Sequence, residues 1–213
     1  FNFVSDELTA HSSISRVVEL LRAGAERYFI NRGLFSNYFL KERLSGCLSE
    51  RGRNASKESV GLLERFKGEF PSGPESAVRV LEALGYSVEI VSKPGYPEYL
   101  LKSHGVVLDA ACVVAPVESL DTKTGDKVAP SYQAVAALKH KRWVVLTNGR
   151  LWRLYSSRVS SASTNYFEVD LEGVVVETDP KLVYFVALFS ASAFMPREGV
   201  TDVDLVYEGG LKY

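Results

Sequence analysis

The sequence predicts an α/β protein in which a mixed β-sheet is flanked by helices and preceded by a helical segment. Two observations carry this prediction. Apolar residues recur at helical spacing through the first part of the chain, and after Gly85 the pattern changes to the alternation typical of strands. Hydrophobic residues make up 46% of the sequence and charged residues 24%, which is sufficient for a sizeable core and ordinary for a globular protein.

The first part of the chain is expected to form helices joined by short loops. Gly33 and Gly85 are typical residues just beyond a helix end, and Pro74 suits a first helical turn. Residues 45–56 are rich in Gly, Ser, Arg and Asn and are expected to form a loop. The four expected helices are 12–32, 34–44, 56–70 and 74–84.

The second part is expected to form six strands and two helices. The apolar run 106–115 indicates a strand covered on both faces. Asn148-Gly149 between two apolar runs predicts a hairpin with a type I′ turn, in which both central residues have positive φ. In the returning strand, Arg153 and Tyr155 share one face, while Trp152 lies on the other and is expected in the core. The expected strands are 87–91, 98–102, 106–115, 142–147, 150–155 and 166–171, and the helices are 131–139 and 181–194.

This order divides the chain into three expected regions. Residues 1–85 form a helical amino-terminal segment, residues 86–196 an α/β domain, and residues 197–213 the start of a linker. Because the chain begins at Phe1 and its last residues do not resemble a natural end, we interpret it as part of a longer protein.

The charge balance argues against a protein that binds nucleic acid over its whole surface. The formal net charge is −1, so any contact with DNA must come from a local basic strip. The alternative is an ordinary solvated surface. The basic residues that cluster in sequence and form the expected DNA-binding strip are Lys139, Lys141, Arg142, Arg150 and Arg153, with His140 among them.

The remaining composition points to an intracellular, cytoplasmic protein without a membrane segment. Cys47 and Cys112 are far apart, have no metal-ligand spacing and are expected to be reduced and buried. The longest apolar run, 182–194, is shorter than the ~20 residues that a bilayer requires. Phosphate-binding glycine loops and a nucleophilic serine elbow are absent from the sequence.

One segment resembles a known family. Trp143–Tyr155, followed by Asn165–Leu171, is similar to the end of the PD-(D/E)XK nuclease-like domain of type IIG restriction enzymes, which fuse an endonuclease to an adenine-N6 DNA methyltransferase. Gly33–Leu44 resembles the element that precedes that domain, and Leu120-Asp121 and Gln133 match an "LD" pair and a helix glutamine of the same family. The resemblance covers roughly residues 28–195 and implies a restriction-endonuclease-like fold, double-stranded DNA as partner and a methyltransferase or other domain downstream.

The resemblance also implies where a Mg²⁺ site belongs. Such a site needs an acidic residue at the end of one strand, and an acidic residue and a lysine on the next. Pro97-Glu98 stands at the first position. The second falls near Cys112–Val114 or Val114–Pro116, where the sequence has neither an acid nor a lysine.

Other residues offer a substitute for the missing motif. Asp109 or Glu118 are the candidate acids, and Lys102 or Lys123 the candidate cations. The expected catalytic set is Glu98, Asp109 and Gln133, with Glu98 and Asp109 as metal ligands.

Two main hypotheses follow from these residues. In the first, a nuclease-like domain with a degenerate metal site belongs to a restriction-modification or phage-defence protein and supports its other parts. In the alternative, the chain is an active Mg²⁺-dependent endonuclease domain. An unrelated α/β domain is the third interpretation. The missing acid and lysine favour the first.

Overall fold

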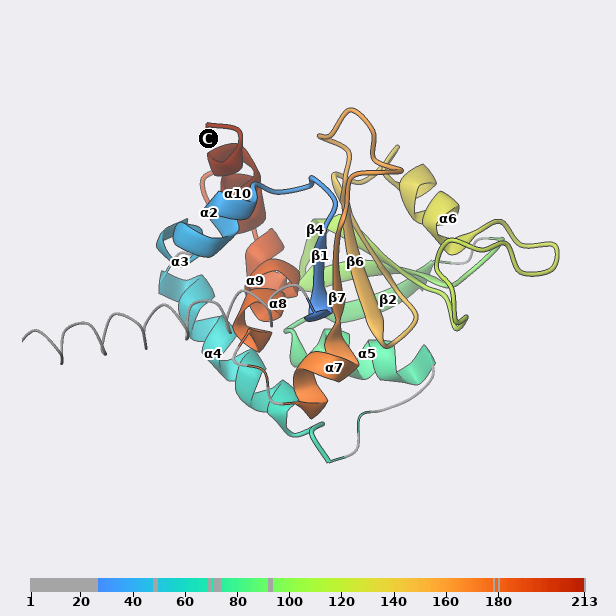
Figure 1. The fold of residues 1–213 in the computed structure, drawn as a ribbon, viewed down its shortest axis with the longest axis horizontal. Coiled ribbons are helices and arrows are strands. Elements are labelled where there is room, and N and C mark those ends of the chain that lie inside the picture. The colour runs from blue at the N-terminus through green and yellow to red at the C-terminus, as the bar shows by residue number, and fades with distance from the viewer. Residues whose placement is uncertain are drawn as a thin grey trace, which may run out of the picture.

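A computed structural model describes residues 27–212 apart from residues 48, 49, 69, 71–73, 92, 93, 178 and 180. The described chain folds around one seven-stranded mixed sheet with the strand order β1-β7-β6-β5-β4-β3-β2. Most helices pack on one face of this sheet, whereas α6 covers part of the other face (Figure 1). The predicted α/β class, a mixed sheet flanked by helices, is therefore confirmed.

The strands follow the alternating segments of the sequence closely. Neighbouring strands are antiparallel except β4 and β5, which run parallel because the chain crosses over through α6 (Pro130–Ala137). The strands are β1 (Phe29–Asn31), β2 (Ser87–Val91), β3 (Glu98–Ser103), β4 (Val106–Val114), β5 (Trp143–Thr147), β6 (Leu151–Ser156) and β7 (Phe167–Asp170).

The pairing register defines a row of residues that crosses the whole sheet on the α6 side. Residues directly opposite each other on paired strands point to the same face. Ala134 and Ala137 of α6 belong to the same buried cluster as Val113 and Leu146, the two residues at the centre of the row. In strand order from β2 to β1, this α6-side row is Val91, Glu98, Val113, Leu146, Arg153, Glu168 and Ile30.

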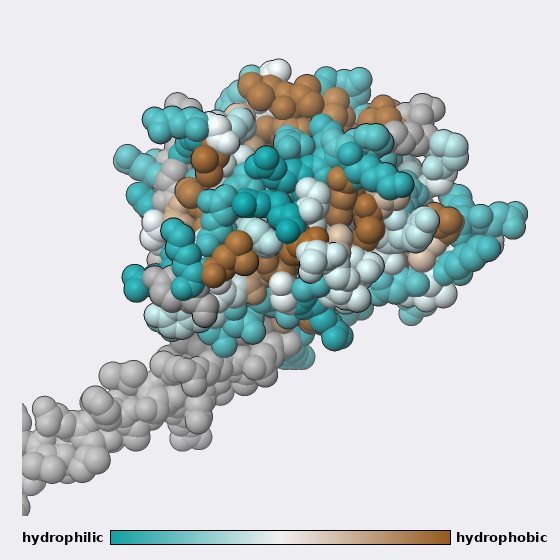
Figure 2. Space-filling model, turned by 90° about the horizontal axis from the view of Figure 1, so that it is seen from above, coloured by the Kyte–Doolittle hydropathy of each residue, from teal (hydrophilic) through white to brown (hydrophobic). Residues whose placement is uncertain are grey.

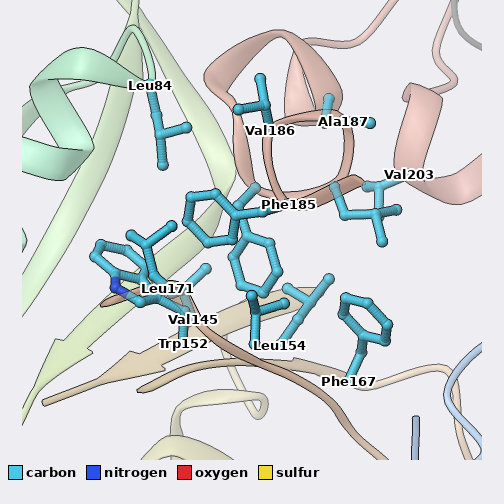
Figure 3. Close-up of a cluster of buried hydrophobic side chains, with 14 of the residues drawn as sticks. Leu84, Val145, Trp152, Leu154, Phe167, Leu171, Phe185, Val186, Ala187 and Val203 are labelled. Carbon is cyan, nitrogen blue, oxygen red and sulfur yellow. The ribbon is translucent and has the colours of Figure 1, made fainter. Parts of the chain in front are cut away.

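The main core lies on the opposite face of the sheet. Trp152 of β6 meets the ring of Phe185 edge-on at a centroid distance of 5.7 Å (Figure 3). The ring of Phe189 meets Trp152 in the same way at 6.5 Å. These two phenylalanines belong to α8 (Leu182–Phe189), which is apolar around most of its circumference because it lies between the sheet and α4 (Glu50–Glu64). Trp152 is fully buried, as the sequence predicted.

The remaining helices complete this layer. Ser190, with an extended ψ of 154°, separates α8 from α9 (Ala191–Phe194), so the single helix expected at 181–194 is two. The other helices are α2 (Asn37–Glu42), α3 (Leu44–Cys47), α5 (Pro74–Ala83), α7 (Leu171–Val176) and α10 (Asp202–Gly210). Among the described residues, none of the helices is long and apolar enough to cross a membrane.

Two expectations for the helical segment were wrong. Residues 29–31, expected to end a helix, form β1 because pairing with β7 outweighs their helical spacing; residues 12–26 of that expected helix lie outside the described residues. The expected loop at 45–56 contains the end of α3 and the first half of α4. Cys112 is buried as expected, but Cys47 is only partly buried.

The described chain has one continuous main core. Leu63 of α4 and Val206 of α10 belong to the same buried cluster as Trp152. The helical segment is therefore not separated from the sheet at residue 85. The linker expected at 197–213 was also wrong over its described part, because α10 packs against α2 and α9 and buries Val203 and Val206.

The type I′ turn is present in a different hairpin from the expected one. Gly149 has a φ of 95°, but Asn148 does not have positive φ. The Asn148 side chain instead organises the turn by accepting from the backbone N–H groups of Arg150 and Leu151 at 3.2 and 2.8 Å. His104 and Gly105, between β3 and β4, both have positive φ (48° and 76°), as a type I′ turn requires.

Two glycines in open surroundings separate backbone strain from packing. A Cβ at Gly105 or at Gly61 would meet nothing within 4 Å. We expect Gly105→Ala to lower the free energy of unfolding by about 1–2 kcal/mol because alanine disfavours positive φ. Gly61→Ala, within α4, is expected to raise it by about 0.5–1 kcal/mol. Urea denaturation measures both changes, and changes of the same sign would contradict the turn assignment.

Candidate functional site

The two predicted metal ligands are not brought together. Glu98 pairs with Val113, and Asp109 lies four residues earlier on β4, which is roughly 13 Å along the strand at ~3.3 Å per residue. Oxygen ligands of one Mg²⁺ lie within about 4 Å of each other, because each is ~2.1 Å from the ion. Asp109 instead accepts from the backbone N–H of Arg142 at 3.0 Å. The expected Glu98–Asp109 metal pair is therefore wrong.

The residues at the end of β4 nearest Glu98 in the pairing register are apolar. Val113 lies directly opposite Glu98, and Ala115 follows on the same face; both are fully buried in the cluster under α6. Across the described ranges, there is no group of three or more His, Cys, Asp and Glu residues that could hold a metal ion. This corner of the sheet is built for packing.

Gln133 holds backbone in this corner. Its Oε1 accepts from the Tyr96 N–H at 2.9 Å, and its Nε2 donates to the Tyr96 carbonyl oxygen at 2.9 Å. Both ends of the amide are thereby used to attach the turn before β3 to α6. The geometry gives Gln133 a positioning role in place of the expected catalytic one.

The predicted basic strip is divided between the two ends of the sheet. Lys139, Lys141 and Arg142 precede β5, whereas Arg150 lies in the turn that follows it. The five residues of β5 separate these groups by roughly 17 Å. A continuous strip of these five residues was therefore a wrong expectation.

Most of these cations also have partners within the protein. The Lys141 Nζ donates to the Leu108 carbonyl oxygen at 3.0 Å. Arg142 lies 3.2 Å from Asp204, and Arg150 contacts both carboxylate oxygens of Asp170 at 2.7–3.2 Å. Lys139 is exposed, so it is the member of the expected set that most freely meets a partner.

Arg153, the fifth expected DNA contact, is buried in a polar cluster on the α6 side. Its guanidinium donates to Glu168 at 2.7 Å and to Asp121 at 2.7 and 3.1 Å. Nη1 also donates to the Tyr155 hydroxyl at 3.0 Å, and the Tyr166 ring lies 4.0 Å from Cζ. These five residues, Arg153, Asp121, Glu168, Tyr155 and Tyr166, form the Arg153 cluster.

The cluster shifts the pKa values of its members. Hydrogen bonding to Arg153 lowers the pKa of Asp121 despite partial burial. Burial raises the pKa of Tyr155 to about 12, although the nearby guanidinium opposes the shift. At neutral pH the cluster therefore holds an ionised carboxylate and a protonated phenol beside the guanidinium.

A second buried charge cluster fastens α10 to the sheet. Asp204 accepts from the Trp143 indole N–H at 3.2 Å, from Arg142 at 3.2 Å and from Arg158 at 3.3 Å. Thr201 begins the helix, because its hydroxyl accepts from the Asp204 N–H at 3.1 Å and donates to the carboxylate at 2.7 Å. Asp204 thus joins α10 to the beginning of β5 and the end of β6.

Sequence reasoning found single members of these clusters and missed their partners. It placed Arg153 and Tyr155 on one strand face and singled out Leu120-Asp121. Arg153, Tyr155 and Asp121 are three of the five residues of the Arg153 cluster, but sequence reasoning did not bring Asp121 to Arg153. Glu168 joins through strand register, and Asp204 lies in a segment expected to be a linker. The Thr201-x-x-Asp204 spacing at a helix start was the available signal for the second cluster.

Comparisons of this chain with family models, with curated proteins and with solved structures find no match. Its function is therefore inferred from the residues and their geometry.

The Asp204 cluster gives a pH-dependent prediction. Burial raises the pKa of Asp204, but the hydrogen bonds from Thr201, Arg142 and Trp143 outweigh this and lower it below the ordinary 3.8. We expect Asp204→Asn to lower the free energy of unfolding at pH 7 by about 1.5–3 kcal/mol, the range for hydrogen bonds to a charged group.

The sign of the pH effect follows from the lowered pKa. Ionised Asp204 stabilises the fold above the unfolded pKa, and this stabilisation is lost as the pH falls through the lower folded value. When the free energy of unfolding is measured by denaturation at a series of pH values, the curves of wild type and Asp204→Asn should therefore converge below about pH 4. Asp126→Asn, an exposed loop carboxylate, is the control. A constant difference down to the acid transition would contradict the ionic role.

Proposed function

We propose that this chain is a nuclease-like α/β module without a catalytic metal site, which supports a DNA-processing protein of the restriction-modification or phage-defence kind. One observation carries the non-catalytic part of the proposal. Glu98, the expected first acid, lies at the start of β3, yet the residue paired with it on β4 is Val113, and Ala115 just beyond β4 is apolar as well.

Burial makes the missing acid and lysine hard to restore within the fold. All four residues from Cys112 to Ala115 are buried, so an ionised side chain at any of them would be desolvated unless it had a partner. Asp109, the substitute acid, interacts with Arg142 at the other end of the sheet. For the chain to be an active endonuclease, both the end of β4 and Asp109 would have to move from these positions.

The DNA association rests on the resemblance of Trp143–Tyr155 to type IIG enzymes. The aromatic residues of that segment, Trp143, Trp152 and Tyr155, are buried. Their likeness to the family therefore supports a shared fold and gives no DNA-contacting surface of its own. Exposed Lys139 is the first candidate among the cations before β5 to reach phosphate, and Lys141, two residues later, can do so if its Nζ leaves the Leu108 carbonyl oxygen.

DNA binding and cleavage test the proposal together. We expect weak binding of a short duplex by fluorescence anisotropy, falling with salt because only a few phosphates are contacted. Replacing Lys139 and Lys141 by alanine should reduce the slope of log K against log salt by about 0.9 for each lost phosphate contact. Supercoiled DNA should remain intact in Mg²⁺ or Mn²⁺.

A matched lysine variant and a carboxylate variant complete the experiment. Lys57→Ala alters an exposed lysine of α4, on the opposite side of the sheet, and should leave binding unchanged. Equal losses in both lysine variants would indicate non-specific charge effects and count against the module's DNA contact. Nicking that disappears in Glu98→Gln would establish the endonuclease alternative.

A further inference from the structure

The Arg153 cluster holds one guanidinium between two carboxylates of different character. Glu168 lies opposite Arg153 on the neighbouring strand β7, and its side chain is 9% exposed. Asp121 comes from the loop between β4 and α6, and its side chain is 60% exposed. Glu168 is thus part of the sheet, whereas Asp121 meets solvent.

Asp121 approaches Arg153 as an external oxyanion would. Its two carboxylate oxygens accept from Nη1 and Nη2 at 2.7 and 3.1 Å, the two-pronged arrangement by which arginine binds carboxylates and phosphates. The neighbouring edge of the guanidinium is occupied by Glu168, whose Oε2 lies 2.7 Å from Nε and 2.7 Å from Nη2, so Nη2 is shared between the two carboxylates. One edge of Arg153 therefore belongs to the sheet and the other to a replaceable ligand.

We propose that the outer edge of Arg153 is a binding site for a phosphate group, which Asp121 occupies in this structure as an internal competitor. The phosphate would take the place of the Asp121 carboxylate on Nη1 and Nη2. The chemistry is the same for inorganic phosphate and for a phosphate of DNA.

The surroundings of this edge suit a phosphate. Tyr155 accepts from Arg153, so its own hydroxyl proton can be donated to a ligand. The Tyr166 ring lies 4.0 Å from the guanidinium carbon and holds its plane in position. Because Glu168 already balances the charge of Arg153, we expect the affinity for phosphate to be modest.

The root of the loop that carries Asp121 is held by contacts other than the one with Arg153. Leu120 is buried, and its carbonyl oxygen accepts from the Ser131 N–H at 2.9 Å, which anchors the root of the loop to α6. Ser119 and Thr122, on either side of Leu120 and Asp121, bond to each other through their hydroxyl groups at 2.8 Å. The loop projects beside α6 in Figure 1, and the projection on that side is mostly hydrophilic in Figure 2. Movement of the Asp121 side chain therefore disturbs no strand.

Removal of the competitor tests the proposal. A phosphorus-31 NMR titration of the whole chain with inorganic phosphate measures the millimolar affinities expected here. Asp121→Asn keeps the size of the side chain and removes its charge, so it should bind phosphate at least tenfold more tightly than wild type. Glu118→Gln, an exposed carboxylate of the same loop, should leave the affinity unchanged.

A second variant and a second probe distinguish the possible results. In the Asp121→Asn background, Tyr155→Phe should reduce the gained affinity several-fold while circular dichroism shows an intact fold. If Asp121→Asn binds inorganic phosphate more tightly than wild type does, the site takes free phosphate. If its affinity rises only for a short DNA duplex, the site takes a phosphodiester. If Asp121→Asn gains affinity for neither probe, the proposal is overturned, whatever the outcome for DNA association through Lys139.

Discussion

The parallel pairing of β4 with β5 places Val113 beside Leu146, and the antiparallel pairings on either side extend that contact into the α6-side row. This register sets Glu98 and Arg153 three strands apart, roughly 14 Å at ~4.8 Å per strand. The two polar groups therefore belong to separate environments, with an apolar centre between them. The cover provided by α6 depends on this arrangement, because it needs apolar side chains beneath it.

Two clusters of charged residues join separate elements of the described fold. Asp204 holds α10 against Arg142, Trp143 and Arg158, and Arg153 links β6 to β7 and to the loop before α6. Buried charges need several well-placed partners to offset the loss of hydration, so each cluster requires one particular arrangement of its elements. Arg142, Arg150 and Arg153 each pair with acidic side chains of the protein. Basic residues that are close in sequence therefore do not form one continuous basic surface.

Local sequence patterns predicted the positions of β2, β3 and β4 well, but they did not predict which distant residues come together. The strands 87–91, 98–102 and 106–115 were predicted from alternation and glycine or proline signals, and they agree with β2, β3 and β4 to within one residue. β1 could not be predicted, because three residues become a strand only through pairing with β7. The prediction of the metal site failed for the same reason. Glu98 and Asp109 are each plausible ligands, but the strand register that separates them depends on long-range pairing.

The central claim is that Glu98 faces packing residues and holds no catalytic metal. Electron paramagnetic resonance of Mn²⁺ added to the whole chain, with and without duplex DNA, measures this directly. We expect the free-ion signal to persist in full at micromolar protein and metal, and to be the same for Glu98→Gln. A stoichiometric loss of the signal that Glu98→Gln abolishes would contradict the account.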